Sequence, residues 1–438
     1  MFMCCLSVIS SIPDSKFPCS PLTREEIENH LSTKTPYRVR QNLNEEPITF
    51  EDCQPRRIWS VIRHGTRNPG KKDIKKIKKV LGKHQGKILN NPDVQMCQKE
   101  LEKMKSWYFK AQPEQEKFLV PIGEDELIEL AERLQKRFPA LLTEDYSQKH
   151  YLFKYTATQR TLKSAESFCT GLFGRHKLSQ VLYPSPVHKD PILRFYKLCT
   201  RWKNEVDKNP EATVEVDKFI ETSPLIEELL KEVRGVTQIK DLSFDDVSLM
   251  YKVCGYETAW NKYGEHSPWC NVFRTTQSLQ VFEFIEDLDY YYIDGYGFEI
   301  THKQACPAIK DLFEHLEPTS THPNATFYFT HSGTVLKLLS HLGLYKDDFV
   351  LTHNDFDKKR KFETSKIDAF ASNIQFVLYE CDDGEPKVLT MHQEKVVTIP
   401  GCPEDSLCKL STLKNIFKES LECDFDGICQ LNQSEESS

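Results

Sequence analysis

A histidine lies between two arginines in the stretch SVIRHGTRNPG at residues 60–70. Arg63, His64 and Arg67 follow an apolar run there without an intervening loop. Guanidinium groups hold phosphate oxygens through paired hydrogen bonds and stay charged at any working pH. A neutral imidazole can attack phosphorus and form a phosphohistidine. These three side chains therefore suit the transfer of a phosphoryl group, and their arginines would supply the positive charge without a metal ion.

Two further stretches repeat this layout, an apolar run followed by a histidine or an arginine. FYFTHSGT at 327–334 carries His331 after its apolar run, and YLFKYTATQRT at 151–161 leads into Arg160. Alone, His331 would more often be a buried turn histidine, and Arg160 would often be a surface arginine. Ligands of open α/β sheets bind at the carboxyl ends of strands. If the three apolar runs are neighbouring strands, we expect three arginines and two histidines to meet in one crevice.

The sequence pattern around these residues predicts a sheet flanked by helices. Apolar runs bounded by turn residues indicate strands, and apolar residues at helical spacing indicate helices. Strands are expected at 56–62, within 151–161, at the start of 326–343 and at 371–381, and helices at 22–31, 71–89 and 124–139. Gly343 is expected to stop the helix after His331. The pattern predicts an α/β fold with an open, mostly parallel sheet and an inserted, mainly helical domain.

The expected domain organisation is discontinuous. The α/β core comprises residues 46–165 and 291–400, and the helical insertion comprises residues 166–290. Residues 1–45 are assigned to an N-terminal leader and extension, and residues 401–438 to a C-terminal tail.

Composition and charge exclude several classes of function. The chain has 438 residues and a formal net charge of −7, which argues against a general nucleic-acid-binding protein because such proteins need a broad basic surface. It lacks a run of about 18 apolar residues, so stable membrane insertion is not expected. The first residues, MFMCCLSVIS, are interpreted either as the remnant of a secretory signal or as a frayed terminus.

The cysteines indicate an oxidising compartment. The chain contains 15 cysteines that are scattered and not arranged as CxxC pairs, which favours disulfides over a zinc site. The odd number leaves at least one free thiol, with Cys4 or Cys5 as candidates. Two glycosylation sequons begin at Asn324 and Asn432. We expect a glycoprotein of the secretory pathway, located outside the cell or in the lumen of the endoplasmic reticulum or lysosome.

Several motifs resemble those of one family. The stretch RHGTRNP resembles the signature of the histidine acid phosphatases, in the branch that contains phytases. Longer stretches look closest to the multiple inositol polyphosphate phosphatases, over about residues 53–402. These stretches are YTATQRTLKSAESFCTGLFG, YYIDGYGFEI, THSGTVLKLLSHLGLYKD and KFETSKIDAFASNIQFVLYEC.

This resemblance implies roles and disulfides that residue spacing alone does not give. His64 would be the phosphorylated nucleophile, and Arg63, Arg67, Arg160 and His331 would hold the transferring phosphoryl group in a histidine phosphatase-like fold. No cofactor or metal is implied. The resemblance also implies three disulfides, Cys53–Cys381, Cys254–Cys270 and Cys402–Cys408.

One position departs from the family pattern. The acid phosphatases usually have Asp directly after the second histidine, and the inositol polyphosphate branch has Ala and then Glu. Here His331 is followed by Ser332, Gly333 and Thr334, so the usual general acid is missing. General acid catalysis typically contributes about 10²–10⁴-fold. Another group could donate the proton, with Asp294, Glu363 and His302 as unranked candidates, or the substrate could supply it.

The predicted function is hydrolysis of phosphomonoesters on inositol polyphosphates, such as inositol hexakisphosphate, through a phosphohistidine on His64. A broad-specificity acid phosphatase and a weakly active polyphosphate-binding protein are the alternatives. Two basic runs are interpreted either as solvated surfaces or as rims that attract a polyanion. The first comprises Lys71, Lys72, Lys75, Lys76, Lys78 and Lys79, and the second comprises Lys358, Lys359, Arg360, Lys361 and Lys366.

Overall fold

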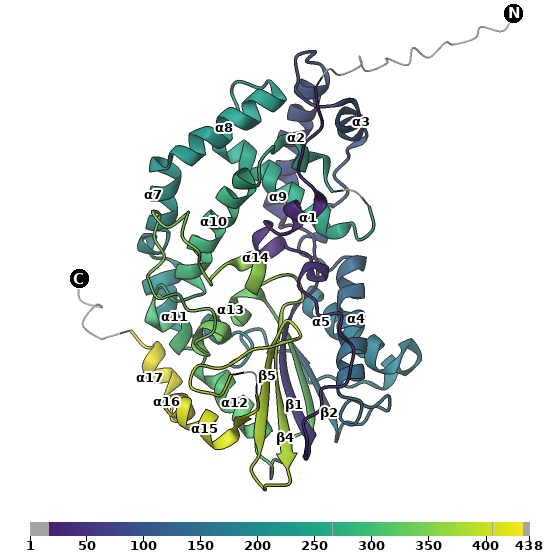
Figure 1. The fold of residues 1–438 in the computed structure, drawn as a ribbon, viewed down its shortest axis with the longest axis vertical. Coiled ribbons are helices and arrows are strands. Elements are labelled where there is room, and N and C mark those ends of the chain that lie inside the picture. Colours follow the sequence, from purple (N-terminus) through teal and green to yellow (C-terminus); the bar gives the residue numbers. More distant parts are fainter. Residues whose placement is uncertain (1–16, 265, 405, 432–438) are drawn as a thin grey trace, which may run out of the picture.

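One sheet and the helices around it organise the molecule (Figure 1). The computed structural model describes residues 17–264, 266–404 and 406–431. The strands are β1 (Cys53–Arg63), β2 (Tyr151–Tyr155), β3 (Ala325–Thr330), β4 (Asn373–Cys381), β5 (Lys387–His392), β6 (Lys395–Val396) and β7 (Cys408–Lys409). Within the described residues they form one seven-stranded sheet in the order β2-β3-β1-β4-β5-β6, and β7 pairs with β5.

Three parallel strands bring the predicted strand ends together. β3 lies between β1 and β2 and pairs with both in parallel. In this register Arg63 lies opposite Thr330, and Tyr155 lies opposite Phe329, so the three strands end at the same edge of the sheet. The prediction that these strands are neighbours is confirmed.

The other half of the sheet is antiparallel. β4 runs antiparallel to β1, and β5 runs antiparallel to β4, β6 and β7. The sheet is therefore mixed, whereas the sequence predicted a mostly parallel one. The physical reason lies in the connection between β4 and β5, a short turn in which Gly384 has φ +75°. Only antiparallel neighbours can be joined by so short a segment.

Helices cover both faces of the sheet. On one side α4 (Pro121–Arg137) packs against α5 (Gln159–Phe173), and on the other α12 (Cys306–Leu316) and α13 (Ser332–His341) contact β1. Gly343 follows α13 with φ +74°, which confirms the predicted helix stop. The short helices α1 (Arg24–Glu28), α6 (Thr200–Trp202), α11 (Glu299–Lys303) and α14 (Thr364–Ile367) fill connections between the larger elements.

A helical half lies beyond the upper end of the sheet in Figure 1. It is built by α2 (Lys71–Leu89), α3 (Gln98–Ser106), α7 (Val214–Thr222), α8 (Pro224–Thr237), α9 (Phe244–Trp260) and α10 (Thr276–Ile293). One buried apolar cluster runs from Trp59 and Phe376 of the sheet to Leu229 of α8 and Phe284 of α10. This apolar cluster is continuous across both halves. The division of the chain into an α/β core domain and a helical insertion therefore stays a prediction.

The N-terminal extension and the C-terminal tail are both built into the fold. Residues 31–37 are buried, and the predicted helix at 22–31 is limited to α1, which Thr23 and Glu26 cap reciprocally. The tail adds β7 and the helices α15 (Leu410–Ile416), α16 (Lys418–Leu421) and α17 (Phe425–Cys429). The interpretation of the first residues as a secretory signal concerns positions outside the described residues.

Six disulfides are present in the described chain, and four of them join segments that are distant in sequence. Cys53–Cys381, Cys254–Cys270 and Cys402–Cys408 are present as predicted. Cys19–Cys97, Cys199–Cys429 and Cys306–Cys423 are additional, and two of them anchor the C-terminal helices. The free cysteine in the described residues is the buried Cys169, whereas Cys4 and Cys5 lie outside them. No helix in the described part of the chain is long and apolar enough to cross a bilayer.

Candidate active site

The histidines and arginines predicted to share a crevice meet at the upper edge of the parallel strands. His64 follows β1 directly and donates its backbone N–H to the Thr330 carbonyl at 3.0 Å. The rings of His64 and His331 have centroids 5.6 Å apart. Arg160, in the first turn of α5, donates to Nδ1 of His331 at 3.1 Å. The geometry therefore joins residues from all three strand ends.

His64 has the tautomer and charge that a nucleophile at phosphorus needs. Its Nδ1 lies 2.9 Å from the Gly65 carbonyl oxygen, so Nδ1 carries the proton and donates it to this hydrogen bond. The lone pair is consequently on Nε2. Burial first, and then the charges of Arg160, Arg67 and Arg63, hold the pKa of His64 well below its usual value. The imidazole is therefore neutral at ordinary pH.

The loop after His64 is held against the start of α4. A Cβ on Gly65 would lie 2.3 Å from the Gly123 carbonyl oxygen, and one on Gly123 would lie 2.2 Å from the Thr66 carbonyl oxygen. Glycine at both positions allows the two backbones to approach this closely. The buried Glu126 then accepts hydrogen bonds from the Thr66 N–H at 2.7 Å and hydroxyl at 2.8 Å. These contacts fix the backbone that carries His64.

Arg63 is fixed by two segments that are distant in sequence. Its guanidinium donates to the Thr33 carbonyl at 2.9 Å and to the Asp368 carbonyl. The Asp368 carboxylate also lies 3.3 Å from Arg63 and accepts a hydrogen bond from the Ser332 hydroxyl. Burial raises the pKa of Asp368 to about 7, although Arg63 opposes this shift. Neither Thr33 nor Asp368 was predicted from the sequence, because nothing local distinguishes either from an ordinary loop residue.

Arg67 reaches toward the helical half of the molecule. It donates to the Tyr256 hydroxyl at 3.1 Å, and its guanidinium lies 5.8 Å from the centroid of that ring. Arg63 and Arg67 also line a cavity of about 330 Å³, together with Lys34, Lys252 and the acidic side chains Asp73, Glu286 and Asp289. This volume lies within the usual range of small-molecule sites.

His331 is the second histidine of the cluster and is also neutral. Its Nε2 lies 2.9 Å from the Thr156 hydroxyl, while its Nδ1 accepts from Arg160. Burial first, and then neighbouring guanidinium groups headed by Arg160, lower the pKa of His331 well below its usual value. Arg160 itself has its pKa lowered to about 10, by burial and then by Arg67 and Arg194, so it remains charged.

Arg194 is a further arginine that the sequence analysis missed. Its charge acts on both His331 and Arg160. The adjacent Leu193 carbonyl accepts hydrogen bonds from the hydroxyls of Thr330 and Thr334, each at 2.8 Å, which ties this segment to the end of β3. The segment PILRF contains no motif that could have indicated this position.

The guanidinium groups retain unused donors. Within the described part of the chain, the Nε atoms of Arg63, Arg160 and Arg194 are buried and have no hydrogen-bond partner. Buried polar atoms are normally hydrogen-bonded, and those that are not require an explanation. Donors of this kind beside two neutral histidines suit the oxygens of a phosphate group.

The three candidate proton donors are placed very differently. Asp294 follows α10, and a Cβ on Gly333 would lie 2.9 Å from its Oδ1. His302 instead lines a separate cavity beside the C-terminal helices, and burial there lowers its pKa to about 4. Glu363 precedes α14 and pairs with Lys366 at 2.7 Å. Of the three, the geometry brings Asp294 to the turn after His331.

The two basic runs are mostly surface features. The lysines of the first run lie along α2 and are exposed, apart from the partly buried Lys78. In the second run Arg360 forms a 2.7 Å pair with the buried Asp287, and Lys358 pairs with Asp355 at 2.7 Å. No residue of either run is among the described residues that line the cavity beside Arg63 and Arg67.

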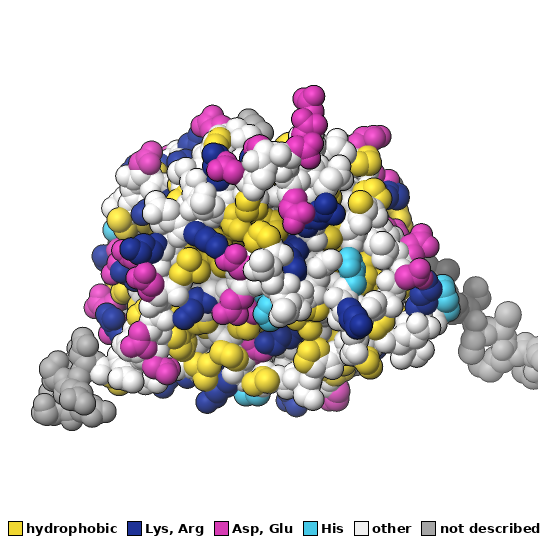
Figure 2. Space-filling view, turned by 90° about the horizontal axis from the view of Figure 1, so that it is seen from below, with side chains coloured by type: hydrophobic (Ala, Val, Ile, Leu, Met, Phe, Trp, Pro, Cys, Tyr) yellow, Lys and Arg dark blue, Asp and Glu magenta, His cyan; other side chains and the backbone are white. Residues whose placement is uncertain are grey.

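The far end of the molecule carries mixed charge. Figure 2 views the molecule from below, at the end of the sheet opposite the carboxyl ends of β1–β3, because β4 points downward in Figure 1 and runs antiparallel to β1. Basic and acidic side chains are interspersed on this face. This face therefore offers no basic patch comparable with the arginine cluster.

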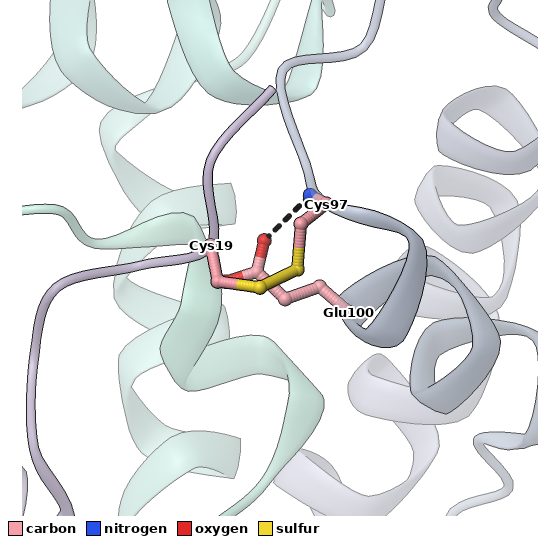
Figure 3. Close-up of side chains that lie close together, drawn as sticks. All are labelled: Cys19, Cys97 and Glu100. Atoms are coloured by element: carbon pink, nitrogen blue, oxygen red, sulfur yellow. Dashed lines mark hydrogen bonds between the residues drawn. A yellow bond between two sulfur atoms is a disulfide. The ribbon is translucent and has the colours of Figure 1, made fainter. Parts of the chain in front are cut away.

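A group of possible metal ligands lies elsewhere. In the described residues, Cys19, Cys97 and Glu100 are close together (Figure 3). The two sulfur atoms form a disulfide, and Glu100 accepts a hydrogen bond from the Cys97 backbone N–H at 3.0 Å as the cap of α3. Because disulfide sulfurs are not thiolates, this group does not suit a metal ion.

The chain is similar to several known proteins in sequence and in fold. Residues 56–393 match the histidine phosphatase superfamily (branch 2). The chain is 34% identical to multiple inositol polyphosphate phosphatase 1 of Drosophila melanogaster over 411 residues, which cover 90% of this chain and 86% of that protein. Its fold resembles the phytase from D. castellii, with a TM-score of 0.75, 17% identity and coverage of 95% and 91% of the two chains. It also resembles the Bifidobacterium longum multiple inositol polyphosphate phosphatase in complex with inositol hexasulfate, with a TM-score of 0.67, 15% identity and coverage of 93% and 99%.

Proposed function

This chain belongs to the histidine phosphatase superfamily (branch 2), and we propose that it hydrolyses phosphomonoesters of inositol polyphosphates through a phosphohistidine on His64. The observation that carries this proposal is the placement of a neutral His64, with its lone pair on Nε2, among Arg63, Arg67 and Arg160. Transfer of a phosphoryl group requires mainly an aligned nucleophile and positive charge that neutralises the phosphoryl oxygens.

Each residue of the cluster has a distinct role in this proposal. His64 attacks phosphorus through Nε2, and its hydrogen bond to Gly65 keeps that atom unprotonated. Arg63, Arg67 and Arg160 bind the oxygens of the transferring group. His331 is kept neutral and oriented by Thr156 and Arg160, so its Nε2–H can turn to a phosphate oxygen. Because three guanidinium groups supply the positive charge, the proposed reaction is independent of metal ions.

Inositol polyphosphates such as inositol hexakisphosphate are the substrate class that we propose. The relative from Drosophila melanogaster and the Bifidobacterium longum protein are both named as multiple inositol polyphosphate phosphatases. The cavity beside Arg63 and Arg67 is also lined by Lys34, which pairs with Glu286, and by Lys252, and these cations could hold further phosphates of such a substrate. A broad-specificity acid phosphatase would not need these additional cations.

The compartment is proposed from the cysteines. Six disulfides span the described chain, and such bonds persist in oxidising compartments. We therefore place the protein in the secretory pathway, either outside the cell or in the lumen of the endoplasmic reticulum or lysosome. Cleavage of a leader and glycosylation at Asn324 or Asn432 remain predictions.

The direct test is release of inorganic phosphate from inositol hexakisphosphate between pH 4 and 8, compared with release from an aryl phosphate. We expect turnover of both compounds and a higher kcat/KM for the inositol compound. A clear preference for the aryl phosphate would support the broad acid phosphatase instead. Tight binding of inositol hexakisphosphate without any release would support the weakly active polyphosphate-binding protein.

A further inference from the structure

The position two residues after His331 is a glycine whose missing side chain leaves room for another group. Gly333 lies in the first turn of α13, and its backbone is outside the left-handed region, so its conformation does not require glycine. A Cβ built there would lie 2.9 Å from Oδ1 and 3.3 Å from Cγ of Asp294. The Asp294 carboxylate thus fills the space where a side chain of residue 333 would begin.

Asp294 is held in this place by a buried lysine. Lys337, one turn further along α13, donates to Asp294 Oδ1 and, at 3.1 Å, to the Ile293 carbonyl. The ammonium group is otherwise enclosed by Trp202 and Tyr196, 4.3 and 4.9 Å from their ring centroids. Among the described residues, Asp294 Oδ2 makes no hydrogen bond, so one carboxylate oxygen is engaged and the other is free.

Several titratable groups interact electrostatically with Asp294. The charge of Asp294 acts on Asp289 and Tyr290 of α10, on Asp368 after α14, on Lys337 of α13 and on Tyr196. Burial and then the charge of Asp294 raise the pKa of Asp289 to about 6. Burial lowers the pKa of Lys337. Asp289 therefore holds a proton in mildly acidic solution.

We propose that Asp294 is the general acid of the reaction and replaces a carboxylate on residue 333. This assignment rests on the proposed function. In the first step, Nε2 of His64 bonds to phosphorus, the ester P–O bond breaks with its electron pair on the leaving oxygen, and the Asp294 carboxyl gives that oxygen its proton. In the second step, water attacks phosphorus, its proton passes to the Asp294 carboxylate, and the P–N bond breaks with its pair returning to Nε2.

A comparison of leaving groups tests this role. An alkoxide of the inositol ring leaves poorly without a proton, whereas p-nitrophenolate leaves readily as the anion. Asp294→Asn should lower kcat on inositol hexakisphosphate by about 10²–10⁴-fold and kcat on p-nitrophenyl phosphate by less than about tenfold. Retained p-nitrophenyl phosphate turnover also shows that the variant is folded, although Lys337 has lost its charged partner.

Moving the carboxylate provides a second test. Gly333→Ala should reproduce the selective loss, because the new Cβ displaces the Asp294 carboxylate, and Gly86→Ala is the matched control because a Cβ there meets nothing within 4 Å. The double variant Asp294→Ala/Gly333→Glu should recover inositol hexakisphosphate turnover to within about tenfold of the natural chain, since the new carboxylate would extend into the emptied space.

Several outcomes would overturn the assignment. Equal losses with both substrates in Asp294→Asn would indicate a structural role only. A selective loss in Asp289→Asn but not in Asp294→Asn would make Asp289 the donor. If the natural chain hydrolyses neither substrate, both this inference and the proposed function fail. If the natural chain is active but the variants lose activity equally with both substrates, only the assignment of Asp294 as donor fails.

Discussion

On the nucleophile side of the crevice, Arg63, His64 and Arg67 come from the end of β1 and the loop directly after it, whereas the donor side joins the end of α10 to the start of α13. The loop is positioned by its own strand and by the close approach of Gly65 to Gly123. The donor side depends on a carboxylate placed against a glycine from a distant segment. The side chains of the first arrangement are neighbours in the sequence, whereas those of the second are brought together only by the folded chain.

This difference reflects what nucleophilic attack and proton donation each require from the protein. Attack on phosphorus needs a dense set of charges within a few ångströms, which a contiguous motif at a strand end provides. Proton donation needs only one correctly placed carboxyl group, which can come from any element that reaches the leaving oxygen. The nucleophile side should therefore tolerate almost no substitution, while the donor side should tolerate relocation.

The largest effect should come from His64→Ala. Removal of the nucleophile should lower kcat by at least about 10⁴-fold with both inositol hexakisphosphate and p-nitrophenyl phosphate, because a good leaving group does not replace the attacking atom. His176→Ala, at an exposed histidine, is the control. Steady-state rates with both substrates measure this effect. A loss confined to the inositol compound would indicate that His64 acts as the proton donor and not as the nucleophile.

Arg160→Gln should have the next largest effect and should also change the pH dependence. We expect kcat/KM to fall by about 10²–10³-fold with either substrate, because a charged donor to the phosphoryl oxygens is lost. Among the neighbouring charged groups, Arg160 lowers the pKa of His64 and of His331 the most. Without it both pKa values rise, so protonation of His64 begins at higher pH and the acid limb of the profile moves upward. An unchanged acid limb would contradict the assigned electrostatics.

A smaller effect is expected from Gly65→Ala. The added Cβ would lie 2.3 Å from a backbone oxygen of α4, so the loop must shift. Overpacking of this kind typically costs about 1–3 kcal/mol in the free energy of unfolding. Thermal unfolding should show a lower Tm for this variant but not for Gly82→Ala, whose Cβ meets nothing within 4 Å. An unchanged Tm would show that the loop is less tightly held than the distances indicate.

The smallest effect should come from the surface lysines of α2. Replacement of Lys71, Lys72, Lys75 and Lys76 with Gln should lower kcat/KM for inositol hexakisphosphate by less than about tenfold, and only at low salt. The kcat/KM values of the variant and of the natural chain should converge as the ionic strength increases. A flat dependence on salt in the natural chain would indicate that these lysines are simply solvated.

The nucleophile side could be predicted from the sequence because its signals are local. An apolar run that ends in RHGTRNP identifies both the strand and the side chains at its end. The parallel placement of β1, β2 and β3 followed from the same layout in three segments. The three disulfides implied by the family resemblance are present, while the other three join segments that no motif links.

The rest could not be predicted because it depends on contacts between distant segments. Thr33 holds Arg63 from a segment that was assigned to an N-terminal leader and extension. Arg194 enters the cluster from a segment without a motif, and the hydroxyls of Thr330 and Thr334 tie that segment to the end of β3. Asp294 was one of three unranked candidates, and only the folded structure places it beside Gly333 while His302 lines a separate cavity. The antiparallel half of the sheet likewise became evident only from the strand pairing.

Trapping the phosphorylated enzyme tests the central claim most directly. The protein would be mixed rapidly with inositol hexakisphosphate and quenched in alkali, which preserves phosphohistidine, and the modified residue would be identified by mass spectrometry. The account predicts phosphate on Nε2 of His64 and none in His64→Ala. Continued turnover without a phosphorylated enzyme, or with phosphate on another residue, would contradict it.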